Sequence, residues 1–106
     1  MKFGLNEETI EKIQAVLSRV PEVDKAVLYG SRAKGNFKNG SDIDLTLYGG
    51  GLNLDILDKV AIGVDDLLLP YEVDLSIFDH ITDPDLIEHI ARVGVVFYTK
   101  GRLREK

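Results

Sequence analysis

Hydrophobic residues recur at helical spacing near the start of the chain. Ile10, Ile13 and Leu17 lie three or four positions apart and would share one face of a helix. Asn6 belongs to the residue types that cap helix N-termini, and Pro21 cannot continue a helix. The pattern therefore predicts an amphipathic helix between the asparagine and the proline.

Two later segments also show helical spacing. Residues 52–69 predict a helix capped by Asn53 and weakened in its later part by Gly63. The positions expected on its apolar face are Leu54, Leu57, Ala61 and Val64. Asp83, followed by a proline, predicts the start of another helix, which Gly94 would end. The positions expected on the buried side of that helix are Leu86, Ile87, Ile90 and Ala91.

Four short segments predict strands, because their residues are apolar or alternate with period two. These segments are residues 25–29, 40–50, 71–78 and 95–99. In the second of them, Asp42 and Asp44 would lie on the face opposite to Ile43. The order helix, strand, turn, strand, helix, strand, helix, strand predicts an α/β (α+β) fold in which helices flank a small mixed sheet.

Composition places the chain among ordinary globular proteins, since 44% of its 106 residues are hydrophobic and 29% are charged. This length favours a single domain over residues 1–106, with the polar residues 101–106 expected to form a flexible tail. The formal net charge of −5 argues against a nucleic acid as partner, because binding to nucleic acid relies on a basic surface.

Several classes of site and location are excluded by what the chain lacks. Without cysteine it can form neither disulfides nor thiolate zinc sites, and it has no thiol nucleophile. Its first residues lack the apolar core of a signal peptide, and no apolar run approaches the ~18 residues of a membrane span. We therefore expect a cytoplasmic protein with no membrane partner.

Two aspartates open the strand predicted around residue 45. Because Asp42 and Asp44 are two residues apart on a strand, their side chains would point the same way, with backbone positions about 6.6 Å apart. Asp74 lies on the polar face of the strand predicted at 71–78. If the two strands are neighbours in the sheet, the three carboxylates converge.

Convergent carboxylates predict a site for a hard divalent cation. Like charges at close range repel, and Mg²⁺ offsets that repulsion while bridging carboxylates to substrate phosphates. A strand ending in Gly30 and Ser31 leads into a glycine-containing loop that can offer backbone N–H groups and a hydroxyl to those phosphates. The Arg32 guanidinium is a further candidate phosphate contact.

Each feature alone also has a purely structural interpretation. An aspartate pair can be a solvated strand face, the glycine-rich segment an ordinary loop, and Arg32 a salt-bridge partner of an aspartate. Ser41 is expected to support Asp42 or to begin the strand. His80 and His89 are nine residues apart on different elements, so they are expected in a loop and on a helix surface. The combination of features favours a functional site.

The combination resembles a known signature. Gly30 and Ser31, ten residues, and then Asp42-x-Asp44 are similar to the pattern of the polymerase-beta-like nucleotidyltransferase superfamily. The segment GSRAKG…SDIDL and the small size resemble the minimal nucleotidyltransferases (MNT), whose members include antitoxins. The resemblance covers residues 27–74.

The resemblance implies a reaction: transfer of a nucleoside monophosphate, expected to be AMP from ATP, with loss of pyrophosphate. It implies two Mg²⁺ ions held by Asp42 and Asp44, with Asp74 binding the catalytic ion and assisting deprotonation of the acceptor. It also implies that Gly30 and Ser31 hold the β- and γ-phosphates.

The resemblance further implies a partner protein. Larger relatives carry an additional acceptor-binding domain, and in the antitoxin branch the partner is a HEPN-domain toxin that can be adenylylated on a tyrosine. A non-catalytic subunit that only blocks its partner is one alternative. A small-molecule transferase with a separate helical subunit is another, and a homodimer stays open. The sequence does not name the acceptor.

Overall fold

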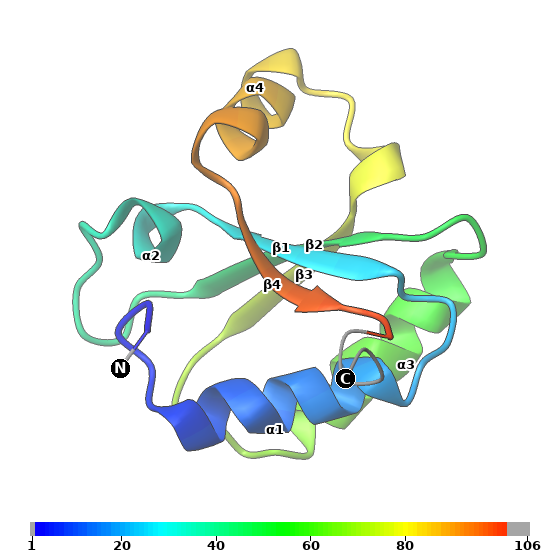
Figure 1. Ribbon diagram of the computed structural model, residues 1–106, viewed down its shortest axis with the longest axis horizontal. Helices are drawn as coiled ribbons and strands as arrows, with labels where there is room; N and C mark the ends of the chain where they lie inside the picture. The colour runs from blue at the N-terminus through cyan, green and yellow to red at the C-terminus, as the bar shows by residue number, and fades with distance from the viewer. Residues whose placement is uncertain (1, 102–106) are drawn as a thin grey trace.

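A four-stranded mixed sheet organises the computed structural model, which describes residues 2–101 (Figure 1). The elements are α1 (Glu7–Ser18), β1 (Lys25–Tyr29), α2 (Ser31–Lys34), β2 (Ile43–Tyr48), α3 (Leu54–Asp65), β3 (Val73–Ile77), the 3₁₀ turn η1 (Phe78–His80), α4 (Pro84–Val93) and β4 (Val95–Thr99). This arrangement confirms the predicted mixed sheet with flanking helices. The predicted tail at 101–106 lies outside the described residues, apart from Gly101.

The strands lie in the order β3-β2-β1-β4. β1 is antiparallel to both β2 and β4, whereas β2 and β3 are parallel. A parallel pair needs a crossover connection, and α3 provides it. The register of the parallel pair sets Asp44 directly beside Asp74. The two strands that carry the predicted carboxylates are therefore neighbours.

The larger part of the core lies between the sheet and the pair α1 and α3, which cover the same face (Figure 1). The apolar stripe predicted for α1 is buried there: Ile13 and Leu17 are fully enclosed. The Asn6 side chain caps α1 by accepting a hydrogen bond from the Thr9 N–H at 2.8 Å. From the sheet, Ile43, Leu45 and Leu47 fill this core.

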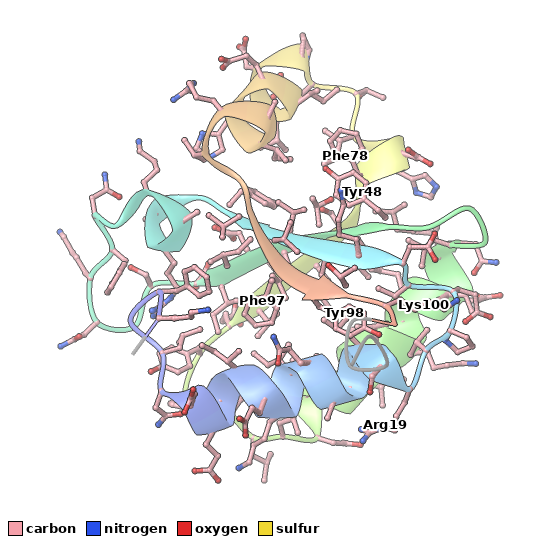
Figure 2. The ribbon with its side chains drawn as sticks, in the orientation of Figure 1. Arg19, Tyr48, Phe78, Phe97, Tyr98 and Lys100 are labelled. Atoms are coloured by element: carbon pink, nitrogen blue, oxygen red, sulfur yellow. The ribbon has the colours of Figure 1, made fainter. Side chains whose placement is uncertain are left out.

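A smaller cluster lies on the opposite face, under α4 and η1 (Figure 1). Asp83 caps α4 and a proline follows at its first turn, as the sequence predicts. Tyr48 stacks on Phe78 on this side of the sheet, whereas Phe97 and Tyr98 lie toward α1 (Figure 2). α4 thus covers the face toward which the alternate residues of β2 point.

Three details of the predicted helices are wrong. The helix expected over 52–69 ends at Asp65, and Leu68 adopts a left-handed φ of 55°, which an α-helix cannot contain. Leu54 is 64% exposed at the start of α3, whereas Val64 is buried as predicted and Val60 is buried on the same side. On α4, Ala91 is exposed while Ile90 is buried. Within residues 2–101, no helix is long and apolar enough to cross a membrane.

Candidate active site

The candidate site lies where β2 and β3 begin, on the side of the sheet that α4 faces. Asp44 and Asp74 are paired residues of the two parallel strands, and Asp42 comes just before β2. Since Ile43 and Leu45 are buried against α1 and α3, Asp44 points to the other face. Asp74 is exposed to solvent on the edge strand.

The three carboxylates interact unfavourably when all are charged. Burial raises the pKa of Asp44 above its usual value, and the charges of Asp74 and Asp42 raise it further, while His89 acts in the opposite direction. Within residues 2–101, no three acidic or histidine side chains stand close enough to hold a metal ion as a group. The structure brings Asp44 and Asp74 side by side but forms no closed cage with Asp42.

This donor set suits Mg²⁺. Its donors are all oxygens, and their mutual repulsion is a cost that a divalent cation would offset. Mg²⁺ is commonly bound through one or two carboxylates together with waters and substrate phosphates, so a closed protein cage is not required. Asp44 and Asp74 provide such a pair of carboxylates, with Asp42 nearby.

Gly30 joins the turn to the carboxylates. It has a φ of 79°, in the left-handed region that favours glycine. A Cβ at this position would also collide with the Asp44 Oδ2 atom. The backbone conformation favours glycine, and any larger residue would push the Asp44 carboxylate aside, so the backbone of the turn lies directly against that carboxylate.

Ser31 follows at the first position of the short α2 and is half-buried. Its hydroxyl has no hydrogen-bond partner within the described part of the chain. Helix-starting residues lack a preceding turn that could accept their N–H groups. A half-buried hydroxyl without a partner is thus available to a ligand one residue after the backbone that contacts Asp44.

Arg32 is engaged inside the protein and is only 3% exposed. Its Nε and Nη2 donate to the Ser41 carbonyl at 3.0 and 2.9 Å, and its Nη1 donates to the Phe3 carbonyl at 2.8 Å. The guanidinium also lies over the rings of Phe37 and Tyr71, at 5.1 and 4.8 Å. This geometry does not favour the predicted phosphate contact, nor the alternative salt bridge to an aspartate.

The loop between the turn and β2 is closed by the same arginine. Ser41 directly precedes Asp42, and its hydroxyl accepts a hydrogen bond from the Lys38 N–H at 2.9 Å. Its own N–H donates to the Lys38 carbonyl at 3.0 Å. Arg32 therefore connects the start of α2 to the residue before the aspartates, and Ser41 closes the loop through Lys38 and not through a bond to Asp42.

His89 is a residue of this site that the sequence-based interpretation placed on a helix surface. It is half-buried, and its Nε2 accepts a hydrogen bond from the Gly30 N–H at 3.2 Å. Its ring meets Tyr29 edge-on, with centroids 6.2 Å apart. The signal was present, because Leu86, His89, Ile90 and Val93 follow helical spacing. Because histidine is polar, the spacing that places it beside the buried residues of α4 was read as a surface position.

A layer of hydroxyl groups lies beside the carboxylates. Ser76 Oγ donates to Thr46 Oγ1 at 2.9 Å, across the parallel strands. Tyr29 is hydrogen-bonded to Ser76; its pKa is raised, chiefly by burial and also by the charges of Asp74 and Asp44. The polar side chains of this sheet face therefore satisfy one another beneath α4.

Comparison with known proteins places the chain in a family. The model of the family described as polymerase beta, nucleotidyltransferase matches residues 11–102. The chain belongs to this family. The match contains both strands that carry the aspartates, together with the turn at Gly30 and Ser31.

Solved structures of similar fold include chains from toxin–antitoxin complexes. A toxin–antitoxin structure with AMP-PNP is 22% identical, with a TM-score of 0.66, covering 95% of this chain and 79% of the other. A tri-AMPylated Shewanella oneidensis HEPN toxin in complex with an MNT antitoxin is 18% identical, with a TM-score of 0.66, covering 95% and 78%. A search of curated proteins gave no match. These likenesses confirm the nucleotidyltransferase-like fold.

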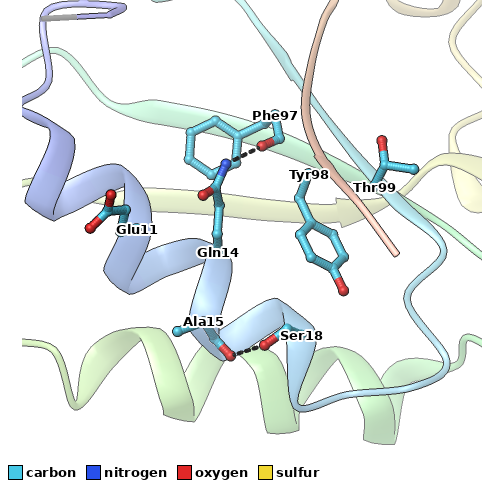
Figure 3. Close-up of a pocket in the computed structure, with 7 residues that line it drawn as sticks. All are labelled: Glu11, Gln14, Ala15, Ser18, Phe97, Tyr98 and Thr99. Atoms are coloured by element: carbon cyan, nitrogen blue, oxygen red, sulfur yellow. Dashed lines mark hydrogen bonds between the residues drawn. The ribbon is translucent and has the colours of Figure 1, made fainter. Parts of the chain in front are cut away.

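A cavity of about 390 Å³ lies away from the nucleotidyltransferase motif, between α1 and β4 (Figure 3). It is lined by Glu11, Gln14, Ala15, Ser18, Phe97, Tyr98 and Thr99. Gln14 Nε2 donates to the Phe97 carbonyl at 2.8 Å within it. The cavity lies against the face of the sheet opposite to the carboxylates, so it is not part of the candidate active site.

Proposed function

We propose that this nucleotidyltransferase moves AMP from ATP to a hydroxyl group of a partner protein in a metal-dependent reaction. The observation that carries the proposal is the contact between the Gly30 backbone and Asp44, whose strand neighbour is Asp74. A turn suited to phosphates and a pair of carboxylates suited to Mg²⁺ thus meet at one point. Nucleotidyl transfer needs this combination, because positioning and charge neutralisation provide most of the catalysis.

The residues take separate roles in this proposal. Asp42 and Asp44 hold Mg²⁺, with Asp74 as a further ligand of the catalytic ion. When bound, two such ions stabilise the attacking and leaving oxygens of the displacement. The Ser31 hydroxyl and the backbone at the start of α2 bind the terminal phosphates.

The chemical step conserves atoms and charge in the usual way. The acceptor oxygen forms a bond to the α-phosphorus, the bond from that phosphorus to the bridging oxygen breaks, and pyrophosphate leaves with its electrons. The proton of the acceptor hydroxyl passes to Asp74. Because Asp74 is exposed on the edge strand, an acceptor from another molecule can approach it.

A HEPN-type helical protein is the proposed acceptor. The structural neighbours include an antitoxin bound to a HEPN toxin that carries three AMP groups. The net charge of −5 also favours a basic protein surface over a nucleic acid as the partner. Support for the acceptor thus comes from fold likeness and charge, and an assay has to establish it.

Incubation with ATP, Mg²⁺ and the product of the adjacent gene is expected to add one or more AMP groups to that partner. Each addition increases the intact mass by about 329 Da, the mass that phosphodiester transfer from ATP leaves behind. Mass spectrometry of the partner measures it. A partner that is bound and inhibited but keeps its mass with every nucleoside triphosphate would instead establish a non-catalytic blocking subunit.

Ser31→Ala is expected to weaken binding of Mg²⁺-ATP about tenfold or more, because a hydrogen bond to a charged group contributes about 1.5–3 kcal/mol. The melting temperature without ligand should stay the same, since the hydroxyl has no partner within residues 2–101. Isothermal titration calorimetry and thermal melts measure the two effects. Ser18→Ala, on the exposed side of α1, is the matched control. Lost stability with unchanged affinity would make Ser31 structural.

A further inference from the structure

The hydrogen bond between Gly30 and His89 links two distant parts of the chain at the candidate site. The Gly30 N–H donates to Nε2 of His89, 59 positions later, at 3.2 Å. A neutral imidazole has one donor and one acceptor nitrogen. Because Nε2 accepts here, the proton must be on Nδ1.

The same contact joins α4 to the turn at Gly30. This helix buries only one residue fully in the sheet cluster, Ile90, while Leu86 and Val93 are partly buried beside it. His89 lies on the same stripe and adds a polar bond to the sheet's own turn. The apolar stripe turns α4 toward the sheet, and the imidazole adds a polar bond from that stripe to the Gly30 turn.

The contact also fixes the peptide group of Gly30. That residue has a left-handed backbone packed against the Asp44 carboxylate, with Ser31 immediately after it. Its N–H is occupied by the imidazole and is therefore not the group that a phosphate would use. The contribution of Gly30 is the space it leaves beside Asp44, and the ligand-facing groups begin at Ser31.

We propose that His89 is a positioning residue of the nucleotide-binding turn, holding the Gly30 peptide through Nε2 so that Ser31 and Asp44 keep their relative placement. The proposal rests on the proposed function, since it assumes that the turn binds a nucleotide. It assigns to α4 a part in the active site that the sequence signature does not contain.

Three substitutions separate this role from a merely structural one. In His89→Gln, the side-chain oxygen reaches about the place of Nε2 and can accept the Gly30 N–H. In His89→Asn it reaches only about the place of Nδ1, and in His89→Ala no acceptor is left. His80→Ala, at an exposed histidine of η1, is the control.

The first readout needs no activity. The ¹⁵N spectrum of the imidazole at pH 8 is expected to show the Nδ1–H tautomer for His89. Hydrogen exchange of the Gly30 amide should accelerate in the Ala and Asn variants and return toward the wild-type rate in the Gln variant. An Nε2–H tautomer would overturn the proposal. So would a Gly30 amide whose exchange rate is the same in wild type and all three variants.

The second readout is binding of Mg²⁺-ATP by calorimetry, together with kcat and KM of the transfer reaction. The Ala and Asn variants are expected to bind about fivefold more weakly, the factor that one hydrogen bond of ordinary net strength gives. The loss should appear mainly in KM, with the Gln variant within about twofold of wild type on the same scale. Equal affinity in wild type and all variants would reject His89 as a positioning residue while leaving the proposed function intact. A wild-type protein that binds Mg²⁺-ATP but transfers nothing would reject the function alone.

Discussion

Asp44→Asn is expected to abolish nucleotidyl transfer and yet to raise the melting temperature of the ligand-free protein. The loss of activity should be about 10³-fold or more, because several kcal/mol of charge stabilisation in the transition state depend on the metal ligands. The gain in stability follows from the unfavourable charge of Asp44 in the folded state. A side chain needed for function would then be a source of instability in the fold.

The raised pKa of Asp44 determines how its contribution to stability changes with pH. Burial and the charges of Asp74 and Asp42 raise the pKa of Asp44 in the folded protein, so the folded state holds the proton more tightly than the unfolded state. Stability therefore falls as the pH rises from the usual aspartate range through the raised pKa. At neutral pH, above the raised pKa, the charged Asp44 destabilises the folded state by the full amount. The Asn substitution removes this destabilisation.

Thermal melts of wild type and Asp44→Asn between pH 3 and pH 8, with a transfer assay at neutral pH, test this prediction. The stability difference should open as the pH rises and then stay constant. Asp58→Asn, at an exposed carboxylate of α3, should change neither activity nor the pH profile. An Asp44→Asn protein that is active, or less stable than wild type at neutral pH, contradicts the assignment.

Arg32→Met is expected to destabilise the protein by about 3 kcal/mol, because the carbonyls of Ser41 and Phe3 lose a charged donor in a buried place. For a domain of this size the melting temperature would fall by about 12 °C or more. Arg32→Lys should recover little, since one ammonium cannot reproduce a planar fork that donates in two directions and stacks on rings.

Urea unfolding with a fitted midpoint and slope measures this loss. Arg92→Met, at an exposed arginine of α4 paired with Glu88, is the control and should stay within about 0.5 kcal/mol of wild type. Wild-type stability combined with lost ATP affinity in Arg32→Met would restore the predicted phosphate contact. A large loss of stability instead shows that Arg32 holds the loop before β2 in place.

Local patterns predicted well what local interactions determine. The cap at Asn6 and the strands around Asp44 and Asp74 depend on neighbours a few positions away, and the structure contains them. The same-face placement of polar residues on β2 follows from strand periodicity alone. The spacing between the turn and the aspartates made the family recognisable, although its meaning depends on a sheet that no single segment encodes.

Long-range contacts explain the features that the sequence-based prediction missed or got wrong, such as the roles of Arg32 and His89. The carbonyl partner of Arg32 at Phe3 is 29 positions away, and the Gly30 partner at His89 is 59 positions away. No local periodicity specifies such pairs. α3 ends at Asp65, three residues before the left-handed turn at Leu68, whose side chain is 87% exposed, so the apolar character of that residue wrongly suggested a longer helix.

The strand order has a consequence for synthesis on the ribosome. β1 pairs on one side with β2, which follows soon after it, and on the other with β4, about 70 residues later in the chain. At ordinary elongation rates that interval lasts roughly 3–14 s. Throughout it the outer edge of β1 has unpaired backbone groups and apolar side chains such as Leu28, a combination that invites intermolecular pairing. Docking of β4 closes that edge, so a nascent chain stalled before residue 95 would be the species most prone to aggregate.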